Sequence, residues 1–85
     1  MEEYYRIIEE KIAASGYPGH LSGEDIYNDI CDEMDDKETG TYLFLSKKGD
    51  DFFIEYRVDV MEDQFNLSTM DIHMPDQIYH IDFDA

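Results

Sequence analysis

The chain has 85 residues and a mass of 10.0 kDa, which is the size of one domain, residues 1–85. Its 22 acidic residues against 6 Lys and Arg give a formal net charge of −16. This charge excludes direct binding to DNA, RNA or anionic membranes and favours a cationic partner. A hydrophobic fraction of 42%, with seven Tyr, five Phe and five Met, is enough to form a small core.

The cysteine content and the apolar stretches point to the cytoplasm. Cys31 is the single cysteine, so no internal disulfide can form, as is usual in a reducing compartment. The first residues lack a basic stretch followed by an apolar run, and no segment approaches 18 consecutive apolar residues. We therefore expect a cytoplasmic protein that is neither secreted nor membrane-spanning.

The first half of the chain has the periodicity of two helices. Tyr5, Ile8 and Ile12 recur at helical spacing between residues 2 and about 14, and the Gly- and Pro-containing segment 15–19 ends this helix. Ser22, followed three residues later by Asp25, resembles a capping box and predicts a second helix that runs to about residue 37.

The second predicted helix has an apolar side and an acidic side. At 100° per residue, its buried arc contains Ile26, Tyr27, Ile30, Cys31 and Met34. An acidic row lies opposite this arc and consists of Asp25, Asp29, Asp32 and Asp36. Eight of the fifteen residues from Glu24 to Glu38 are acidic, including Glu33 and Asp35 beside the row. Like charges four residues apart disfavour a helix, so local stability does not explain this arrangement.

The second half of the chain alternates as β-strands do. Strands are expected at 41–45 and 51–60, joined by a loop at 47–49 with Gly49 at a positive φ. The second strand is apolar at its even positions, and the predicted pairing places Tyr42 and Phe44 on the same inner face. This pairing leaves an outer patch of Leu43, Leu45 and Phe53, through which a homodimer could form.

Two further strands, 66–74 and 77–83, meet at a turn formed by Pro75 and Asp76. Phe65 and Leu67 are out of phase with Met70, which predicts a bulge near residues 68–69. The predicted fold is α+β: two N-terminal helices packed on one face of a four-stranded antiparallel sheet, in the order ααββββ.

One face of the last hairpin carries the residue types of a metal site or an acid–base pair, namely Asp71, His73, His80 and Asp82. A two-residue turn would place Asp71 directly opposite His80. The same pattern is also typical of a solvated sheet face, so two interpretations stand: a divalent-metal or catalytic site, or ordinary surface pairing. We found no other motif for a catalytic residue, a metal or a cofactor, and we expect a protein that is not an enzyme.

The acidic row is the strongest functional signal. Carboxylates four residues apart on a helix are spaced about 6 Å apart, similar to successive phosphates of one nucleic-acid strand. We therefore expect a nucleic-acid mimic that binds the basic substrate groove of a nuclease or similar protein. The residues expected to bind this partner are Asp25, Tyr27, Asp29, Asp32, Glu33, Asp35 and Asp36.

In charge and size alone, the chain resembles the small acidic proteins of phages and mobile elements that inhibit CRISPR nucleases and restriction enzymes. Immunity proteins and antitoxins that neutralise basic toxins share this character. The resemblance implies an anti-CRISPR or antirestriction inhibitor, with an immunity protein or antitoxin as the alternative. No sequence motif supports the resemblance, and many unrelated folds have the same character.

Overall fold

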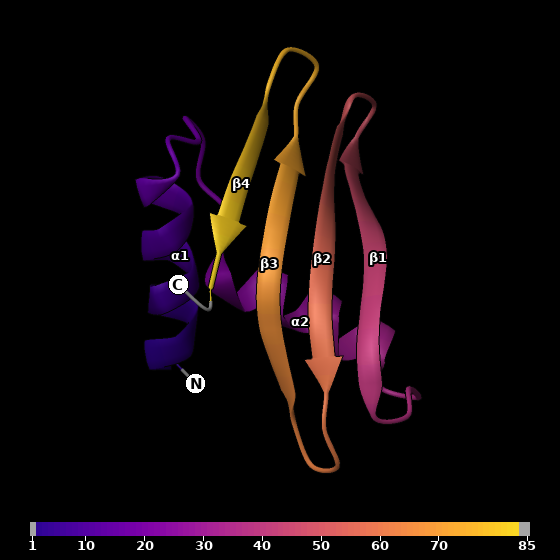
Figure 1. Cartoon of the computed structure of the whole chain (residues 1–85). Helices are drawn as coiled ribbons and strands as arrows, with labels where there is room; N and C mark the ends of the chain where they lie inside the picture. The colour runs from indigo at the N-terminus through magenta and orange to yellow at the C-terminus, as the bar shows by residue number, and fades with distance from the viewer. Residues whose placement is uncertain (1, 84–85) are drawn as a thin grey trace.

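The computed structural model describes residues 2–83 and contains two helices followed by four strands (Figure 1). The elements are α1 (Glu2–Ala14), α2 (Gly23–Met34), β1 (Gly40–Gly49), β2 (Phe52–Val60), β3 (Phe65–His73) and β4 (Ile78–Asp82). The strands form one antiparallel sheet in the order β1-β2-β3-β4. This α+β arrangement confirms the fold that the sequence predicts.

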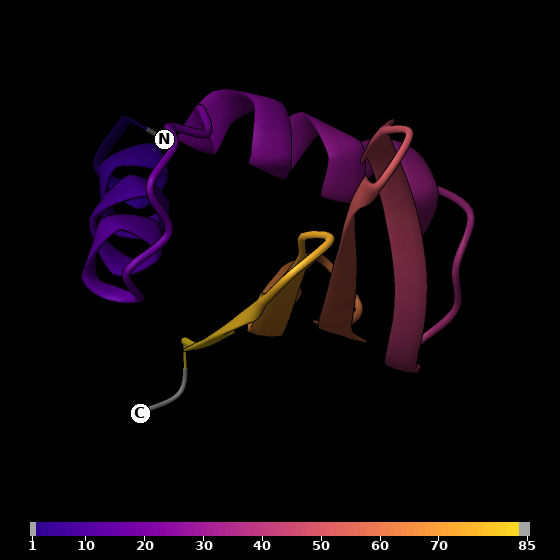
Figure 2. The same cartoon turned by 90° about the horizontal axis from the view of Figure 1, so that it is seen from above.

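The two helices shield one face of the sheet and leave the other open. Figure 1 views the open face, with α2 crossing behind the strands and α1 lying along the β4 side; Figure 2 shows the same layers from above. The core between the layers contains Ile8 and Ile12 from α1, and Ile26, Ile30 and Met34 from α2. The sheet contributes Ile54, Tyr56, Val58, Val60, Leu67, Met70, Ile72 and Ile81. The helical and alternating apolar positions of the sequence therefore meet in one core.

Helix α2 is shorter than expected and ends at Met34 instead of about residue 37. The backbone amide of Lys37 donates to the carbonyl oxygen of Met34, which closes a turn after the last helical residue. Asp35 and Asp36 come directly after the last residue of α2. The helix dipole disfavours negative charge at the C-terminal end of a helix, so these two residues oppose another helical turn. Asp36 is thus outside the helix that was expected to contain it.

The first hairpin differs from the expected loop. Gly49 pairs with Phe52, so the turn is formed by Asp50 and Asp51, and the ladder shifts register between Lys47 and Gly49. Gly49 has no positive φ, contrary to the prediction. The shift restores the expected inner pairs, Tyr42 with Val58 and Phe44 with Tyr56.

The second and third hairpins match the sequence patterns. Arg57 pairs with Thr69 and Val58 with Leu67, so Ser68 is the extra residue of the predicted bulge. Asp71 pairs with His80, and Pro75 and Asp76 lie at the predicted turn. The even positions of β3 after the bulge face the helices, and the odd positions lie on the open face.

Candidate functional site

Helix α2 exposes most of the predicted acidic residues. Ile26, Ile30 and Met34 are buried against the sheet, so the opposite side of the helix faces solvent. The exposed carboxylates are those of Asp25, Asp32, Glu33, Asp35 and Asp36, whereas Asp29 is half-buried. The packed underside fixes the direction in which this acidic surface points.

The start of α2 is anchored to α1. The hydroxyl oxygen of Ser22 accepts a hydrogen bond from the backbone amide of Asp25 at 3.4 Å. A carboxylate oxygen of Glu9, on α1, accepts from the backbone amide of Gly23 at 2.8 Å. These acceptors satisfy amides that the first helical turn leaves free, and the charge of Glu9 suits the positive end of the helix dipole.

Asp29 differs from the rest of the row because β1 neutralises it. Its carboxylate accepts a hydrogen bond from the hydroxyl of Ser46 at 3.1 Å and contacts the ammonium of Lys48. This contact ties the middle of α2 to β1 and removes one free charge from the predicted row. The sequence did not indicate this contact, because Ser46 and Lys48 are 17 and 19 residues away from Asp29 along the chain.

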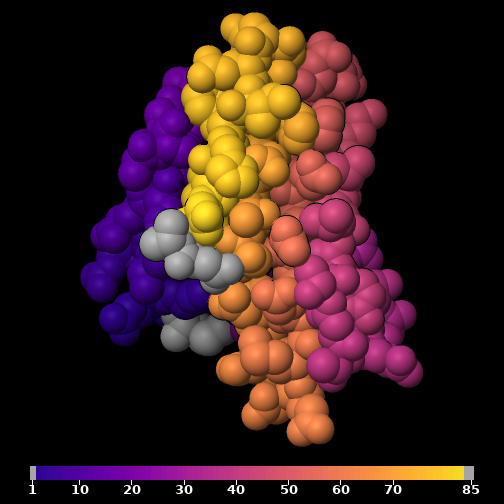
Figure 3. Space-filling model, viewed as in Figure 1, coloured from indigo at the N-terminus to yellow at the C-terminus, as the bar shows by residue number. Residues whose placement is uncertain are grey.

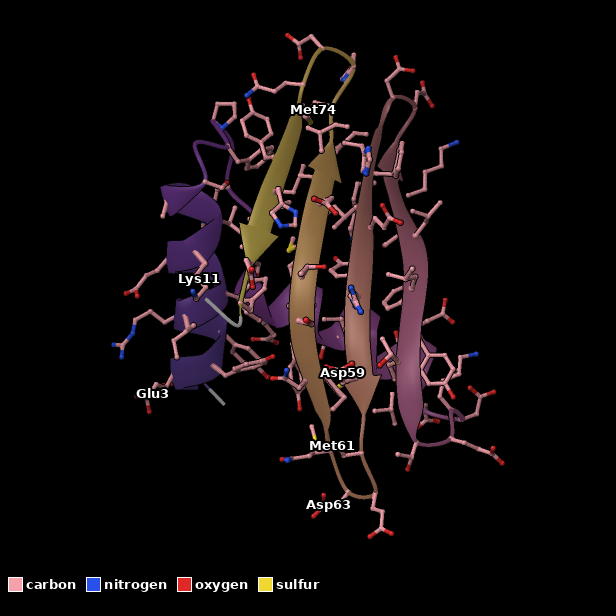
Figure 4. The ribbon with its side chains drawn as sticks, viewed as in Figure 1. Glu3, Lys11, Asp59, Met61, Asp63 and Met74 are labelled. Atoms are coloured by element: carbon pink, nitrogen blue, oxygen red, sulfur yellow. The ribbon has the colours of Figure 1, made fainter. Side chains whose placement is uncertain are left out.

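The other basic residues do little to neutralise α2. Arg6 pairs with Glu10 on α1, and Lys11 donates to a backbone oxygen of β4 at 3.4 Å, a position visible in Figure 4. Lys37 lies 4.0 Å from a carboxylate oxygen of Asp36, whose side chain is 85% exposed, so this pair is weak. Within residues 2–83, no ion pair forms at four of the predicted residues: Asp25, Asp32, Glu33 and Asp35.

A shallow acidic groove lies between α2 and β1. It is lined by Asp29, Asp32, Glu33, Phe44, Leu45 and Ser46. Three of the predicted acidic residues, Asp29, Asp32 and Glu33, thus share a concave site with residues of the edge strand β1. The sequence places these acids on the helix surface but does not indicate the groove.

Tyr27 lies on the other flank of α2, away from Asp29. Its ring packs edge-on against Tyr4 of α1, with ring centroids 5.6 Å apart, and lies 5.3 Å from the ring of Phe65 at the start of β3. Burial is the main cause that raises the pKa of the Tyr27 hydroxyl. The structure therefore places Tyr27 in an aromatic contact between elements, and it does not join the acidic surface.

The Asp and His residues of the last hairpin lie on the open face but form no common cluster. His80 Nδ1 is 2.5 Å from Asp71 Oδ1, as the predicted cross-strand pair requires. His73 instead lies 3.5 Å from a carboxylate oxygen of Glu55, and its ring stacks on Phe53 with centroids 4.3 Å apart. Asp82 pairs with Thr69 in the ladder.

These contacts bear on the predicted metal or catalytic site. Among residues 2–83, no three His, Cys, Asp or Glu side chains are grouped so that they could hold a metal ion. The sequence did not indicate the contact of His73 with Glu55, because it depends on how β2 and β3 align. The geometry therefore favours separate cross-strand pairs on this face.

Comparison of the chain with protein-family models, curated proteins and solved structures finds no match. In the described part of the chain, neither helix has the length and apolar character that crossing a membrane requires. A functional proposal must therefore rest on the charge and geometry of the surface.

Proposed function

We propose that this protein is a non-enzymatic inhibitor that imitates nucleic acid and binds the basic substrate groove of a nuclease or another nucleic-acid-handling defence enzyme. The proposed inhibitor is of the anti-CRISPR or antirestriction type. One observation carries it: α2 exposes several carboxylates that form no ion pair within residues 2–83, above a buried apolar underside, in a chain with a net charge of −16.

Exposed carboxylates remain near both ends of α2, although the middle of the predicted row is engaged. Asp25 and Asp32 are seven residues apart, which is about two helical turns and 10.5 Å along the axis. Asp35 continues the acidic surface at the C-cap of the helix. With Asp29 engaged by Lys48, the charges offered to a partner are separated along the helix and are not one continuous row.

The rigidity of α2 also supports it. The helix is held by its core contacts, by the hydrogen bond between Glu9 and Gly23, and by the contact between Asp29 and Lys48. A charged surface that is already ordered loses little conformational entropy on binding. Opposite charges on the partner would raise the association rate and make it sensitive to salt.

The test is a binding screen against purified CRISPR nucleases, restriction enzymes and toxin nucleases at 50 and 300 mM NaCl, with DNA or RNA as competitor. We expect one target to bind the protein in competition with its nucleic acid, with affinity at least tenfold weaker at the higher salt. A toxin nuclease as the target would identify an immunity protein instead. Binding that is indifferent to salt or to nucleic acid would overturn the mimicry.

A charge-matched pair of variants locates the surface. The triple variant Asp25→Asn, Asp32→Asn, Asp35→Asn removes three negative charges from α2 and its cap, and we expect about a tenfold or greater loss of affinity.

The control variant Asp51→Asn, Glu62→Gln, Asp76→Asn removes the same charge from exposed residues of the three hairpin turns. We expect less than a threefold loss from it. Equal losses in the two variants would mean that only net charge matters and that α2 is not the binding surface.

A further inference from the structure

The free edge of β1 is the least protected part of the sheet. In the strand order β1-β2-β3-β4, β1 pairs with β2 alone, and no described segment pairs with its other edge. At the opposite edge, α1 runs along β4, and Lys11 reaches a backbone oxygen there (Figures 1 and 4). β1 thus presents unpaired backbone donors and acceptors to solvent.

The sequence of β1 lacks the usual protection of an edge strand. Proteins block such edges with charged residues, proline, a bulge or a short strand. β1 is ten residues long, and its segment from Thr41 to Ser46 contains no charge and no proline. The bulge and the two lysines come only at its end, after Ser46. The middle of the strand is open to pairing with another chain.

The two sides of this edge differ in chemistry. On the helix side, the groove below α2 is lined by Asp32 and Glu33, which form no ion pair within residues 2–83. On the open face, Leu43 and Leu45 are 66% and 62% exposed. Figure 2 shows the C-terminal end of α2 beside β1, and Figure 3 shows β1 at the margin of the open face.

We propose that an extended segment of the partner adds to the sheet as a strand beside the middle of β1. Successive side chains of a strand point to opposite faces. Lys or Arg at alternate positions of the segment would face Asp32 and Glu33, and apolar residues at the intervening positions would cover Leu43 and Leu45. Backbone hydrogen bonds give such strand addition its affinity, and the alternating side chains give it specificity.

The proposal rests on the proposed function, because it uses carboxylates of the same helix and adds how the cationic partner engages them. The charge of the groove selects this occupant over a second copy of the chain. Antiparallel pairing of two β1 edges about a two-fold axis perpendicular to the sheet would bring the acidic grooves of two molecules, each with a net charge of −16, to the same side of a joined sheet. A cationic segment meets attraction at the place where a second copy meets repulsion.

The test uses an eight-residue capped peptide of alternating Lys and Val, with the full chain at low micromolar concentration and 50 mM NaCl. The readouts are affinity by titration and amide hydrogen exchange by NMR. We expect the peptide to bind and to slow exchange at least tenfold at amides between Leu43 and Lys47 that do not pair with β2. The block isomer, four Lys followed by four Val, has the same composition and should bind at least tenfold more weakly.

Further controls separate backbone pairing from charge attraction. The alternating peptide with every internal amide N-methylated keeps all charges but cannot donate backbone hydrogen bonds, and it should fail to protect β1. The variant Asp32→Asn, Glu33→Gln should weaken peptide binding about tenfold, whereas Glu62→Gln, Asp63→Asn should leave it within twofold. Leu43→Thr with Leu45→Thr should weaken it by a smaller factor, because these contacts are partly solvent-exposed.

Several outcomes would overturn the inference. These are equal binding by the block isomer, retained binding and protection with the N-methylated peptide, absence of peptide binding, or protection outside β1. Protection of β1 that appears without peptide and rises with protein concentration would identify a second copy as the occupant. Failure of this inference is distinguishable from failure of the proposed function: a nuclease that depends on Asp25, Asp32 and Asp35 but leaves β1 amides unprotected removes only the strand addition.

Discussion

Gly23 provides a direct test of how α1 positions α2. It is the first residue of α2, its backbone amide donates to Glu9, and a Cβ atom at this position would lie 2.2 Å from the backbone oxygen of Tyr5. That distance is more than 1 Å short of the 3.4 Å at which ordinary contact begins. The obstructing atom is backbone, so Gly23→Ala can be accommodated only if the two helices move apart.

The expected sign is opposite to the one that propensity alone predicts. Replacing glycine by alanine at an unstrained position stabilises a protein by about 0.4–1 kcal/mol, through the entropy of the unfolded chain. Forcing an extra methyl group into a packed site costs about 1–3 kcal/mol, and weakening the hydrogen bond to Glu9 adds about 1 kcal/mol. We therefore expect Gly23→Ala to lower the free energy of unfolding by about 1–3 kcal/mol.

The measurement is urea unfolding followed by circular dichroism; urea is used because guanidinium would screen the charges. Gly49→Ala is the matched control, because its Cβ would meet only Phe52 Cβ at an ordinary 3.6 Å and its φ is not positive. We expect the control to change stability by less than about 1 kcal/mol. If Gly23→Ala were as stable as the parent protein or more stable, the close approach of α1 and α2 would be refuted.

Three further predictions concern the core and the charge. Ile30→Ala should cost about 2–5 kcal/mol in urea unfolding, because Ile30 is fully buried beneath α2; a loss below 1 kcal/mol would contradict the packing of the helix on the sheet. Burial, and then the charge of Asp29, raise the pKa of Tyr56 above its ordinary 10.0, so stability should be intact below pH 10 and fall as the pH rises beyond it. Tyr56→Phe should make this alkaline loss smaller; an unchanged loss would exclude Tyr56 as a cause. Raising NaCl from 10 to 500 mM should increase the free energy of unfolding, since the screening length falls from about 30 Å to a few ångströms while the molecule measures 37 × 27 × 21 Å; a decrease would show that attraction between charges outweighs repulsion.

The fold was largely predictable because side-chain direction is a local property of the backbone. Ile26 and Ile30 share a side of any helix, and Ile54 and Tyr56 share a face of any strand, whatever else the chain does. The bulge at Ser68 was predictable for the same reason, since Leu67 and Met70 can face one core only if an extra residue lies between them.

The first hairpin shows where local reasoning fails. A two-residue turn at Asp50 and Asp51 would by itself place Leu43 on the inner face, and the register shift after Lys47 reverses that outcome. The inner position of Phe44 was predicted correctly, but from a loop that the structure does not contain. The turn and the bulge shift the register of β1 in opposite directions, and the alternation of apolar residues reflects only the net register.

The candidate site, like the first hairpin, was predictable only in part. The sequence determined that α2 has an acidic side opposite an apolar one, because helical spacing and residue type fix both. Only the tertiary structure decided that Lys48 engages Asp29, that Tyr27 packs on Phe65 and away from the acidic surface, and that a groove joins Asp32 to the free edge of β1. These features depend on which distant segments meet, and periodicity along one element carries no information about its neighbours.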